Sequence, residues 1–462
     1  MLIFGTLYQH PTIKNMMKRA LLLLSLLAVP CVLTSYMAEA APSTDTATTT
    51  VSPLDKICNL LKLSRYSEKE IKIFRAGYTG NTATLENLKD KNHIGIYCFG
   101  AAATGNKELV LQCLDKGSQP NRGLQGAAFG GHMDIVQLML SKGADPDWGL
   151  YGAAMSGHMN IVQLLLKKGA TDYNWGLQGA AQGGHMDIVQ LLLDKGADLN
   201  WGLDGAASGG HMDIVQLMLS KGAKPNDGLW GAALGGHMDI VQLLLSKGAT
   251  DYDRGLKGAA LGGHMDIVQL LLKKGANPDE GLWIAAEDGH MDIVQLLLEK
   301  GADPNAGLRG AALGGHMEIV QLMLEKGATV YSWGLDGAAS VGHMDIVQFL
   351  LAKGADPDVG LHSAAMSGHM DIVQLLLDKG ADPDKGLDGA ALCGHMEIVQ
   401  LMLSKGATDY DKGLYGAALY GHMDIVQLLL SKGATNLDSA LDAAELNGHT
   451  ECAELIRAAM KK

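Results

Sequence analysis

The sequence has no excess of basic residues. Its 462 residues include 37 lysines and arginines against 50 aspartates and glutamates, which gives a formal net charge of −13 at pH 7. Proteins that bind nucleic acids usually present a basic face to the phosphate backbone. We therefore do not expect nucleic acid among the partners of this protein.

Cysteine is also scarce. Of the six cysteines, one lies in an N-terminal apolar run and five are irregularly spaced. The five are Cys58, Cys98, Cys113, Cys393 and Cys452. An odd number without regular spacing predicts no disulfide framework. Cys98 and Cys113 could pair, but we favour the interpretation that they are two buried free thiols.

The third feature that the chain lacks is a long apolar run. The longest one extends from Ala20 to Leu33, contains Pro30, and falls short of the roughly 20 residues that cross a bilayer. It follows the basic pair Lys18-Arg19 and precedes the small residues Ala38-Glu39-Ala40. This pattern is typical of a cleavable secretory signal peptide.

We therefore predict a signal peptide at residues 1–40, in which residues 1–15 are an upstream extension if the chain starts at Met16 or Met17. The alternative, an uncleaved membrane anchor, fits less well because the run is short. The mature chain would begin at Ala41, have no membrane span, and be either periplasmic or secreted.

What the chain has in abundance is one repeated motif, Gly-Leu-x-Gly-Ala-Ala-x-x-Gly-His-Met-Asp-Ile-Val-Gln-Leu-Leu-Leu-x-Lys-Gly-Ala. It returns every 26 or 27 residues, and the longer interval recurs at every third copy, which gives a higher period of 79 residues. Twelve well-formed copies begin at Gly123, Gly149, Gly176, Gly202, Gly228, Gly255, Gly281, Gly307, Gly334, Gly360, Gly386 and Gly413. Weaker copies near Lys72, Tyr97 and Ala440 have the place of caps. Such self-similarity predicts a solenoid.

Each copy predicts two antiparallel helices. In the copy that begins at Gly123, Leu124 and the Ala127-Ala128 pair form a small apolar face, and Gly131-His132 supplies the turn. The residues Met133 to Leu140 place apolar side chains at helical spacing in the second helix, before a Lys-Gly stop signal. One copy alone cannot bury this surface, so neighbouring copies must stack.

These observations predict an all-α fold. We expect a solenoid of about fifteen repeats at residues 72–462, in which the first two and the last act as caps. A flexible linker at 41–53 and an N-terminal helical segment at 54–71, with helices around Leu54–Leu63 and Ser67–Phe74, would precede it.

The segment Ala-Ala-x-x-Gly-His-x-x-Ile-Val-x-Leu-Leu-Leu-x-x-Gly-Ala is similar to the ankyrin repeat from about Lys72 to the C-terminus. The usual ankyrin unit has about 33 residues and carries Thr-Pro-Leu-His at the start of its first helix. Here the unit is shorter and has Trp-Gly-Leu-Gln or its equivalents at that place. The resemblance therefore implies a helix-turn-helix solenoid with shortened or absent β-hairpins. It also implies a scaffold that binds proteins, and short repeats of this kind in large viruses and host-associated bacteria suggest a host partner.

The ankyrin resemblance places the residues that follow Ala-Ala on a concave groove. The first of these in each copy is Phe129, Met155, Gln182, Ser208, Leu234, Leu261, Glu287, Leu313, Ser340, Met366, Leu392 or Leu419. A mostly apolar stripe of this length, if exposed, indicates a protein partner. In the alternative interpretation, these side chains pack on the next repeat.

Aromatic residues form a second stripe at the edge of the turns. Trp148, Trp175, Trp201 and Trp333 stand just before Gly-Leu, whereas Tyr151, Trp230, Trp283 and Tyr415 stand just after it. Aromatic side chains are favoured as interface anchors. We therefore expect a protein-binding surface that includes the six tryptophans, Phe129, Tyr151 and Met155, on a monomeric chain. Shielding of the turn backbone is the alternative for the aromatics, and a structural spacer or surface stalk is the alternative for the whole protein.

Two further patterns concern metal ions. Thirteen of the sixteen histidines occupy the same Gly-His turn. Stacked helices lie about 10 Å apart, so equivalent histidines cannot share a zinc ion that needs ligands at about 2 Å. Acidic turns such as Asp145-Pro146-Asp147 and Asp382-Pro383-Asp384 lack enough oxygen ligands for calcium, and we interpret them as solvated turns.

Catalysis generally needs one asymmetric set of residues, and no activated serine, cysteine or carboxylate pair stands out as unique. The Gly-Leu-x-Gly-Ala-Ala-x-x-Gly segment resembles a phosphate-binding loop, but no predicted strand precedes it and it occurs a dozen times. We therefore expect a protein that is not an enzyme and needs no cofactor.

Overall fold

The computed structural model describes residues 68–461. The predicted signal peptide at 1–40, the linker at 41–53 and the predicted helix at Leu54–Leu63 lie outside these residues. The predicted helix at Ser67–Phe74 falls on a longer helix that runs from Glu68 to Thr79. The boundary that we placed between residues 71 and 72 therefore lies inside one helix.

All regular structure between residues 68 and 461 is helical, with no strand, and the helices come in pairs joined by short turns. The predicted all-α solenoid without β-hairpins is confirmed. Within the described residues the chain divides into two compact units, which meet between Lys274 and Gly275 in the sequence.

The first unit contains eight helix pairs within the described residues. They are α3 (Glu68–Thr79), α4 (Thr82–Asn87), α5 (Lys91–Ala103), α6 (Lys107–Asp115), α7 (Pro120–Gly130), α8 (Met133–Ser141), α9 (Asp147–Met155), α10 (Met159–Lys167), α11 (Tyr173–Gln182), α12 (Met186–Asp194), α13 (Leu199–Gly209), α14 (Met212–Ser220), α15 (Pro225–Leu234), α16 (Met238–Ser246), α17 (Tyr252–Gly262) and α18 (Met265–Lys274). Cys98 on α5 and Cys113 on α6 are buried free thiols.

The second unit contains seven pairs. They are α19 (Asp279–Glu287), α20 (Met291–Glu299), α21 (Pro304–Gly314), α22 (Met317–Glu325), α23 (Tyr331–Val341), α24 (Met344–Ala352), α25 (Pro357–Ser367), α26 (Met370–Asp378), α27 (Asp384–Leu392), α28 (Met396–Ser404), α29 (Tyr410–Tyr420), α30 (Met423–Lys432), α31 (Leu437–Leu446) and α32 (Thr450–Met460). None of the helices between residues 68 and 461 is long and apolar enough to cross a membrane.

The first helices of neighbouring pairs pack against each other at backbone distance. In α13, Leu203, Ala206 and Ala207 are completely buried. A Cβ atom added to Gly205 would lie 2.3 Å from the carbonyl oxygen of Gln178 on α11. No larger side chain fits this contact in α13, which favours glycine at this position; Ile284 and Ser363 take its place in two copies.

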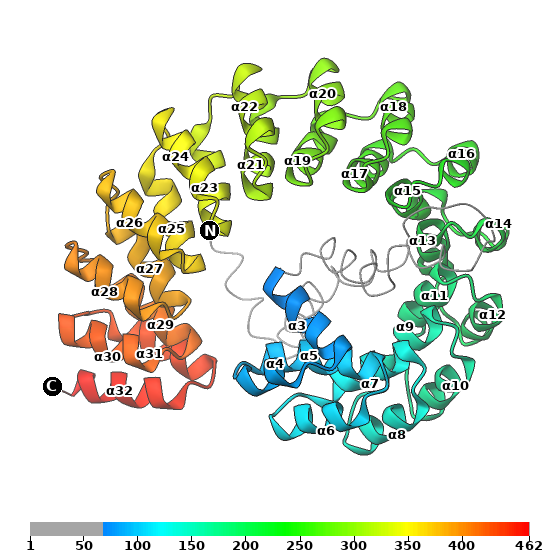
Figure 1. Cartoon of the computed structure of the whole chain (residues 1–462), viewed down its shortest axis with the longest axis horizontal. Helices are drawn as coiled ribbons and strands as arrows, with labels where there is room; N and C mark the ends of the chain where they lie inside the picture. Colours follow the sequence, from blue (N-terminus) through cyan, green and yellow to red (C-terminus); the bar gives the residue numbers. More distant parts are fainter. Residues whose placement is uncertain (1–67, 462) are drawn as a thin grey trace. The chain divides into compact units, whose positions relative to one another are not determined.

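The second helices carry the larger side chains, and neighbouring second helices barely touch each other. Ile214, Val215 and Met218 of α14 are completely buried between the two layers. Because the first helices pack closely and the second helices do not, each unit curves toward its first helices, which line the inner side in Figure 1.

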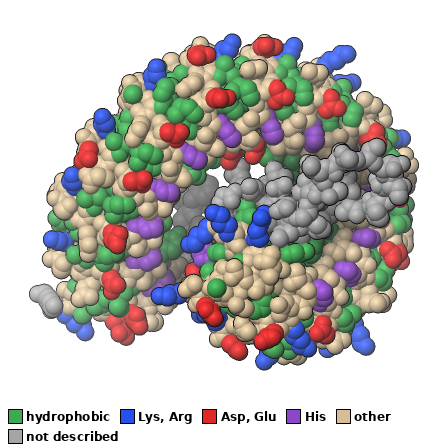
Figure 2. All heavy atoms as spheres, viewed as in Figure 1, with side chains coloured by type: hydrophobic (Ala, Val, Ile, Leu, Met, Phe, Trp, Pro, Cys, Tyr) green, Lys and Arg blue, Asp and Glu red, His purple; other side chains and the backbone are tan. Residues whose placement is uncertain are grey.

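The turn histidines join each repeat to the one before it. Nε2 of His211 lies 3.0 Å from the carbonyl oxygen of Gln182, and Nε2 of His132 lies 3.2 Å from that of Ala103. A carbonyl oxygen only accepts, so Nε2 carries the proton. Burial lowers the pKa of His211, so this imidazole is neutral at pH 7. Figure 2 shows these side chains along the inner border of each unit, and the part of the chain from 68 to 461 holds no metal-binding group of three or more histidine, cysteine or acidic side chains.

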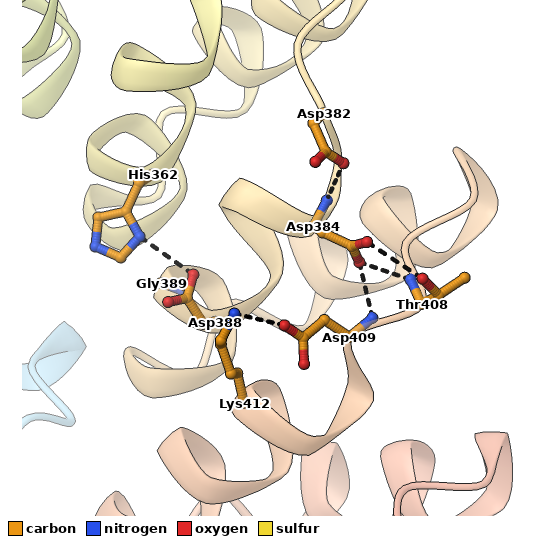
Figure 3. Close-up of polar contacts among 8 residues, drawn as sticks. All are labelled: His362, Asp382, Asp384, Asp388, Gly389, Thr408, Asp409 and Lys412. Carbon is orange, nitrogen blue, oxygen red and sulfur yellow. Dashed lines mark hydrogen bonds and ion pairs between the residues drawn. The ribbon is translucent and has the colours of Figure 1, made fainter.

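The acidic turns are not simply solvated, as we had interpreted them. Oδ1 of Asp384 accepts hydrogen bonds from the backbone N–H groups of Thr408 (2.6 Å) and Asp409 (2.8 Å) in the next repeat (Figure 3). Asn226 and Asp411 make the same pair of contacts to their next repeats. These side chains therefore link the start of each first helix to the turn that opens the next repeat.

Substitution of Gly205 by alanine should destabilise the first unit by about 1–3 kcal/mol, because the added methyl group meets the backbone of α11. Gly152, at the equivalent position of α9, is the matched control, since its added Cβ would meet nothing closer than 3.3 Å. Urea unfolding of both variants, followed by circular dichroism, compares them. Equal stability of the two variants would contradict the close-packing argument.

Substitution of Asp384 by alanine should increase amide hydrogen exchange at Thr408 and Asp409, at a cost of about 1–2 kcal/mol at pH 7. Burial alone would raise the pKa of Asp384, but hydrogen bonds from Asp409 and Thr408 hold it below its usual value. Its contribution is therefore present above the unfolded pKa of about 3.9 and is lost as the pH falls through the folded pKa.

The exposed Asp442 on α31 is the control for this substitution. Asp442→Ala should leave the exchange of the Thr408 and Asp409 amides unchanged. If Asp384→Ala leaves both amides as protected from exchange as in the wild type at pH 7, the hydrogen bonds to Asp384 do not stabilise the linker.

Candidate functional site

Three variable positions of each first helix share its inner face. They are the residue before Gly-Leu, the residue after Gly-Leu and the residue after Ala-Ala, which we call the first, second and third inner rows. In α13 these are Trp201, Asp204 and Ser208, spaced three and four residues apart, and helical periodicity places them on one face. The constant Leu203 and the alanine pair on the other side are completely buried. The information that differs between repeats therefore lies on this inner face.

The predicted contact residues of the first unit come together in part. The ring of Tyr151 meets the ring of Trp175 edge-on, with 5.8 Å between centroids, and the rings of Trp175 and Trp201 lie 5.3 Å apart. The hydroxyl of Tyr151 donates to Oε1 of Gln182 over 2.8 Å. These residues form a continuous aromatic strip, Tyr151–Trp175–Trp201, across three repeats.

Trp148 lies in the first inner row, as Trp175 and Trp201 do, and the guanidinium of Arg122 stands 5.7 Å from the ring centroid of Trp148. The tryptophans before Gly-Leu lie inside the first turns of their helices; Trp148, for example, is the second residue of α9. The sequence had indicated the edge of a turn for them. Their side chains thus belong to the helix face and not to the linker.

The other predicted residues stand on other repeats. Trp230 on α15 and Trp283 on α19 are half-buried. Trp333 on α23 is 55% exposed, which makes it the most accessible tryptophan of the described residues.

The third inner row supports both of the interpretations that the sequence left open. Met155 and Leu234 are buried, Phe129 and Leu392 are half-buried, and Met366 is exposed. Phe129 reaches toward the next repeat, since a Cβ atom on Gly152 would lie 3.3 Å from its own Cβ. Most of this row therefore packs on the following first helix, and Met366 is its accessible member.

The second inner row contains an arrangement that sequence reasoning missed. Asp336 pairs with Arg309 of the preceding repeat over 2.9 Å, and Asp388 pairs with His362 of the preceding repeat over 3.2 Å (Figure 3). Asp204 faces the preceding repeat in the same way but meets Gln178, whose Nε2 donates to its Oδ2 over 2.8 Å. The signal was present in the sequence as charged residues one repeat apart.

The protonation of these residues follows from their partners. The hydrogen bond to Asp388 raises the pKa of His362. Burial would raise the pKa of Asp388, but His362 holds it below its usual value. Burial raises the pKa of Asp204 to about 6, although Arg254 and Gln178 act in the opposite direction.

The second unit has a cavity of about 450 Å³ on its inner face. It is lined by His362, Met366, Asp388, Leu392, Lys412 and Tyr415, among others. Nζ of Lys412 lies 2.6 Å from Asp409 (Figure 3), so its charge is already compensated. The lining of this cavity carries both charge signs, from Asp388 and Lys412.

Two family models match the chain, and both describe ankyrin repeats. The model described as ankyrin repeats (3 copies) matches nine overlapping segments that together run from residue 124 to residue 413. The model described as ankyrin repeat matches residues 414–440. No curated protein matches the chain.

Substitution of Asp204 by asparagine should stabilise the first unit at pH 7. Because the folded pKa of about 6 lies above the unfolded value of about 3.9, the free energy of unfolding falls as the pH rises through this window. Removal of the charge should recover about 1–3 kcal/mol at pH 7 and little at pH 4. Urea unfolding at the two pH values measures the difference.

Asp336→Asn is the matched control, because Asp336 has the partner Arg309. This partly exposed ion pair contributes only about 0.2–1 kcal/mol, so its loss should destabilise slightly. A less stable Asp204→Asn variant at pH 7 would show that the Asp204 carboxylate is well compensated in the folded protein.

Proposed function

Because the chain belongs to the ankyrin repeat family, we propose that it is an exported scaffold whose inner face holds a protein partner, with the aromatic strip Tyr151–Trp175–Trp201 at the centre of the contact. The family's repeats form protein-interaction scaffolds. The finer assignment rests on the residues that differ between the otherwise constant copies.

One observation carries this proposal. The repeats bring three aromatic rings into direct contact on the inner face, with centroids 5.3 and 5.8 Å apart. Interfaces draw most of their binding energy from a few aromatic and arginine side chains near the centre. A spacer or stalk needs only the constant residues and gives no reason for such a cluster.

Export is supported by the basic and apolar pattern of residues 16–40 alone. The resemblance to short repeats of host-associated organisms favours a host protein as the partner. Both points concern where the partner is found, and they are independent of the inner-face assignment.

Trp175→Ala and Trp201→Ala should each weaken binding of the partner at least about 30-fold, which corresponds to about 2 kcal/mol for a hot-spot residue. The partner is identified by cross-linking the full-length protein in its native surroundings, and affinity is then measured by titration. Trp333→Ala is the comparison variant, because Trp333 occupies the same inner row outside the strip and is 55% exposed; its substitution should weaken binding less than either strip variant. Circular dichroism checks that each variant is folded.

Retained affinity in both strip variants would overturn the inner-face assignment. If function is lost only when a whole 79-residue block is deleted, and not in either substitution variant, the chain is a spacer. The N-terminal sequence and intact mass of the protein recovered from each cell fraction test export, since a chain that begins at Ala41 outside the cytoplasm supports it and an intact N-terminus inside contradicts it.

A further inference from the structure

Asp204 and Asp336 occupy the same position of two identical segments. Residues 202–208 and 334–340 both read Gly-Leu-Asp-Gly-Ala-Ala-Ser. Each aspartate lies in the second inner row and faces the second-row residue of the preceding repeat. The two sites differ in the identity of that second-row residue. The same aspartate can therefore be compared with two different partners within one molecule.

At Asp336 the preceding residue is Arg309, whose guanidinium lies 2.9 Å from the carboxylate. At Asp388, in the same row, the preceding residue is His362. The fold thus supplies a cationic partner to an aspartate of this row in two repeats. At Asp204 it supplies the neutral Gln178, which donates one hydrogen bond to Oδ2.

The other oxygen of Asp204 has no such partner. Oδ1 is shielded from solvent and accepts no hydrogen bond from residues 68–461. It points toward α15, where a Cβ atom on Gly231 would lie 3.2 Å away. The charges of Arg254 and Asp227 act on Asp204 in opposite directions, and neither residue forms an ion pair with it within the described chain. A shielded carboxylate that no cation contacts directly is costly, so a cation supplied by a partner would stabilise it.

The surroundings suit a guanidinium in particular. Trp201 lies one helical turn before Asp204 on the same face. The ring centroid of Trp175 lies 5.3 Å from that of Trp201. Two repeats earlier, on α7 and α9, the same row already holds a guanidinium over a tryptophan, since Arg122 stands 5.7 Å from the centroid of Trp148. Arginine stacks on aromatic rings and pairs with carboxylates through a planar fork, which lysine does not.

We propose that Asp204, with Trp201 one helical turn before it and Trp175 against the Trp201 ring, receives the arginine side chain of a protein partner. This inference rests on the proposed function, because it names the chemistry of the group that the inner face binds. The partner's arginine takes the role at Asp204 that Arg309 has at Asp336.

The test is a titration of the full-length protein with N-acetyl-arginine amide, followed by tryptophan fluorescence. N-acetyl-citrulline amide, which is neutral and of nearly the same shape, is the matched probe, and N-acetyl-lysine amide tests the preference for the planar fork. We expect a saturable change with the arginine probe, at least tenfold weaker binding of the citrulline probe, and intermediate binding of the lysine probe.

Asp204→Asn should weaken the arginine probe at least tenfold, whereas Asp336→Asn should leave its affinity unchanged. Gln178→Arg is the second variant, because it recreates the Arg309–Asp336 pair inside the first unit. It should abolish binding of the probe while raising the midpoint of urea unfolding, so lost binding cannot be ascribed to a damaged fold.

Wild-type protein that shows no saturation, or variants Asp204→Asn and Gln178→Arg that bind like the wild type, would overturn the arginine site. Tighter binding of the citrulline probe would do the same and would indicate a neutral ligand. None of these results touches the loss of partner binding in Trp175→Ala and Trp201→Ala, so failure of this inference is distinguishable from failure of the proposed function.

Discussion

The contact of first helix with first helix at backbone distance is the constraint on which the rest of the molecule depends. It requires glycine where a Cβ atom would meet the carbonyl of the preceding repeat, as at Gly205, and alanine on the buried side of the same helix. The second helices, which carry leucine, isoleucine and valine, cannot approach as closely. The difference between the two layers bends each unit and turns the variable residues of the first helices toward one side.

Two sets of polar contacts complete this packing. The turn histidine bonds to the carbonyl of the preceding repeat, and an aspartate or asparagine at the start of the first helix bonds to backbone N–H groups of the following repeat. Both contacts satisfy backbone groups that the short turns would leave without partners. They also explain how a repeat of 26 or 27 residues dispenses with the β-hairpin of the longer ankyrin unit.

The framework uses the constant residues, and the inner rows carry variable residues that face neighbouring repeats. There the side chains of adjacent repeats meet and form pairs that no single repeat encodes, such as Arg309–Asp336 and His362–Asp388 in one unit and Trp175–Trp201 in the other. Asp204 is the member of this set whose counterpart is neutral. Function is therefore expected in combinations of neighbouring repeats and not in any single copy.

The sequence by itself determined the class of fold, the number of repeats and the family, because a motif of constant length that returns a dozen times admits one architecture. It also indicated the structural role of the histidines and the rows that carry the differences. The interpretation of the acidic turns as solvated was wrong. Both the Thr408 and the Asp409 amides donate to Asp384, which lies 24 and 25 residues earlier in the chain.

Which variable side chains touch was decided only by the tertiary structure. The ring contact between Tyr151 and Trp175, the exposure of Trp333 and the neutral partner of Asp204 all depend on how one repeat is stacked and rotated on the next. Sequence periodicity places residues on a face, but distances of 3 to 6 Å between repeats are fixed by packing, to which every constant glycine and leucine contributes.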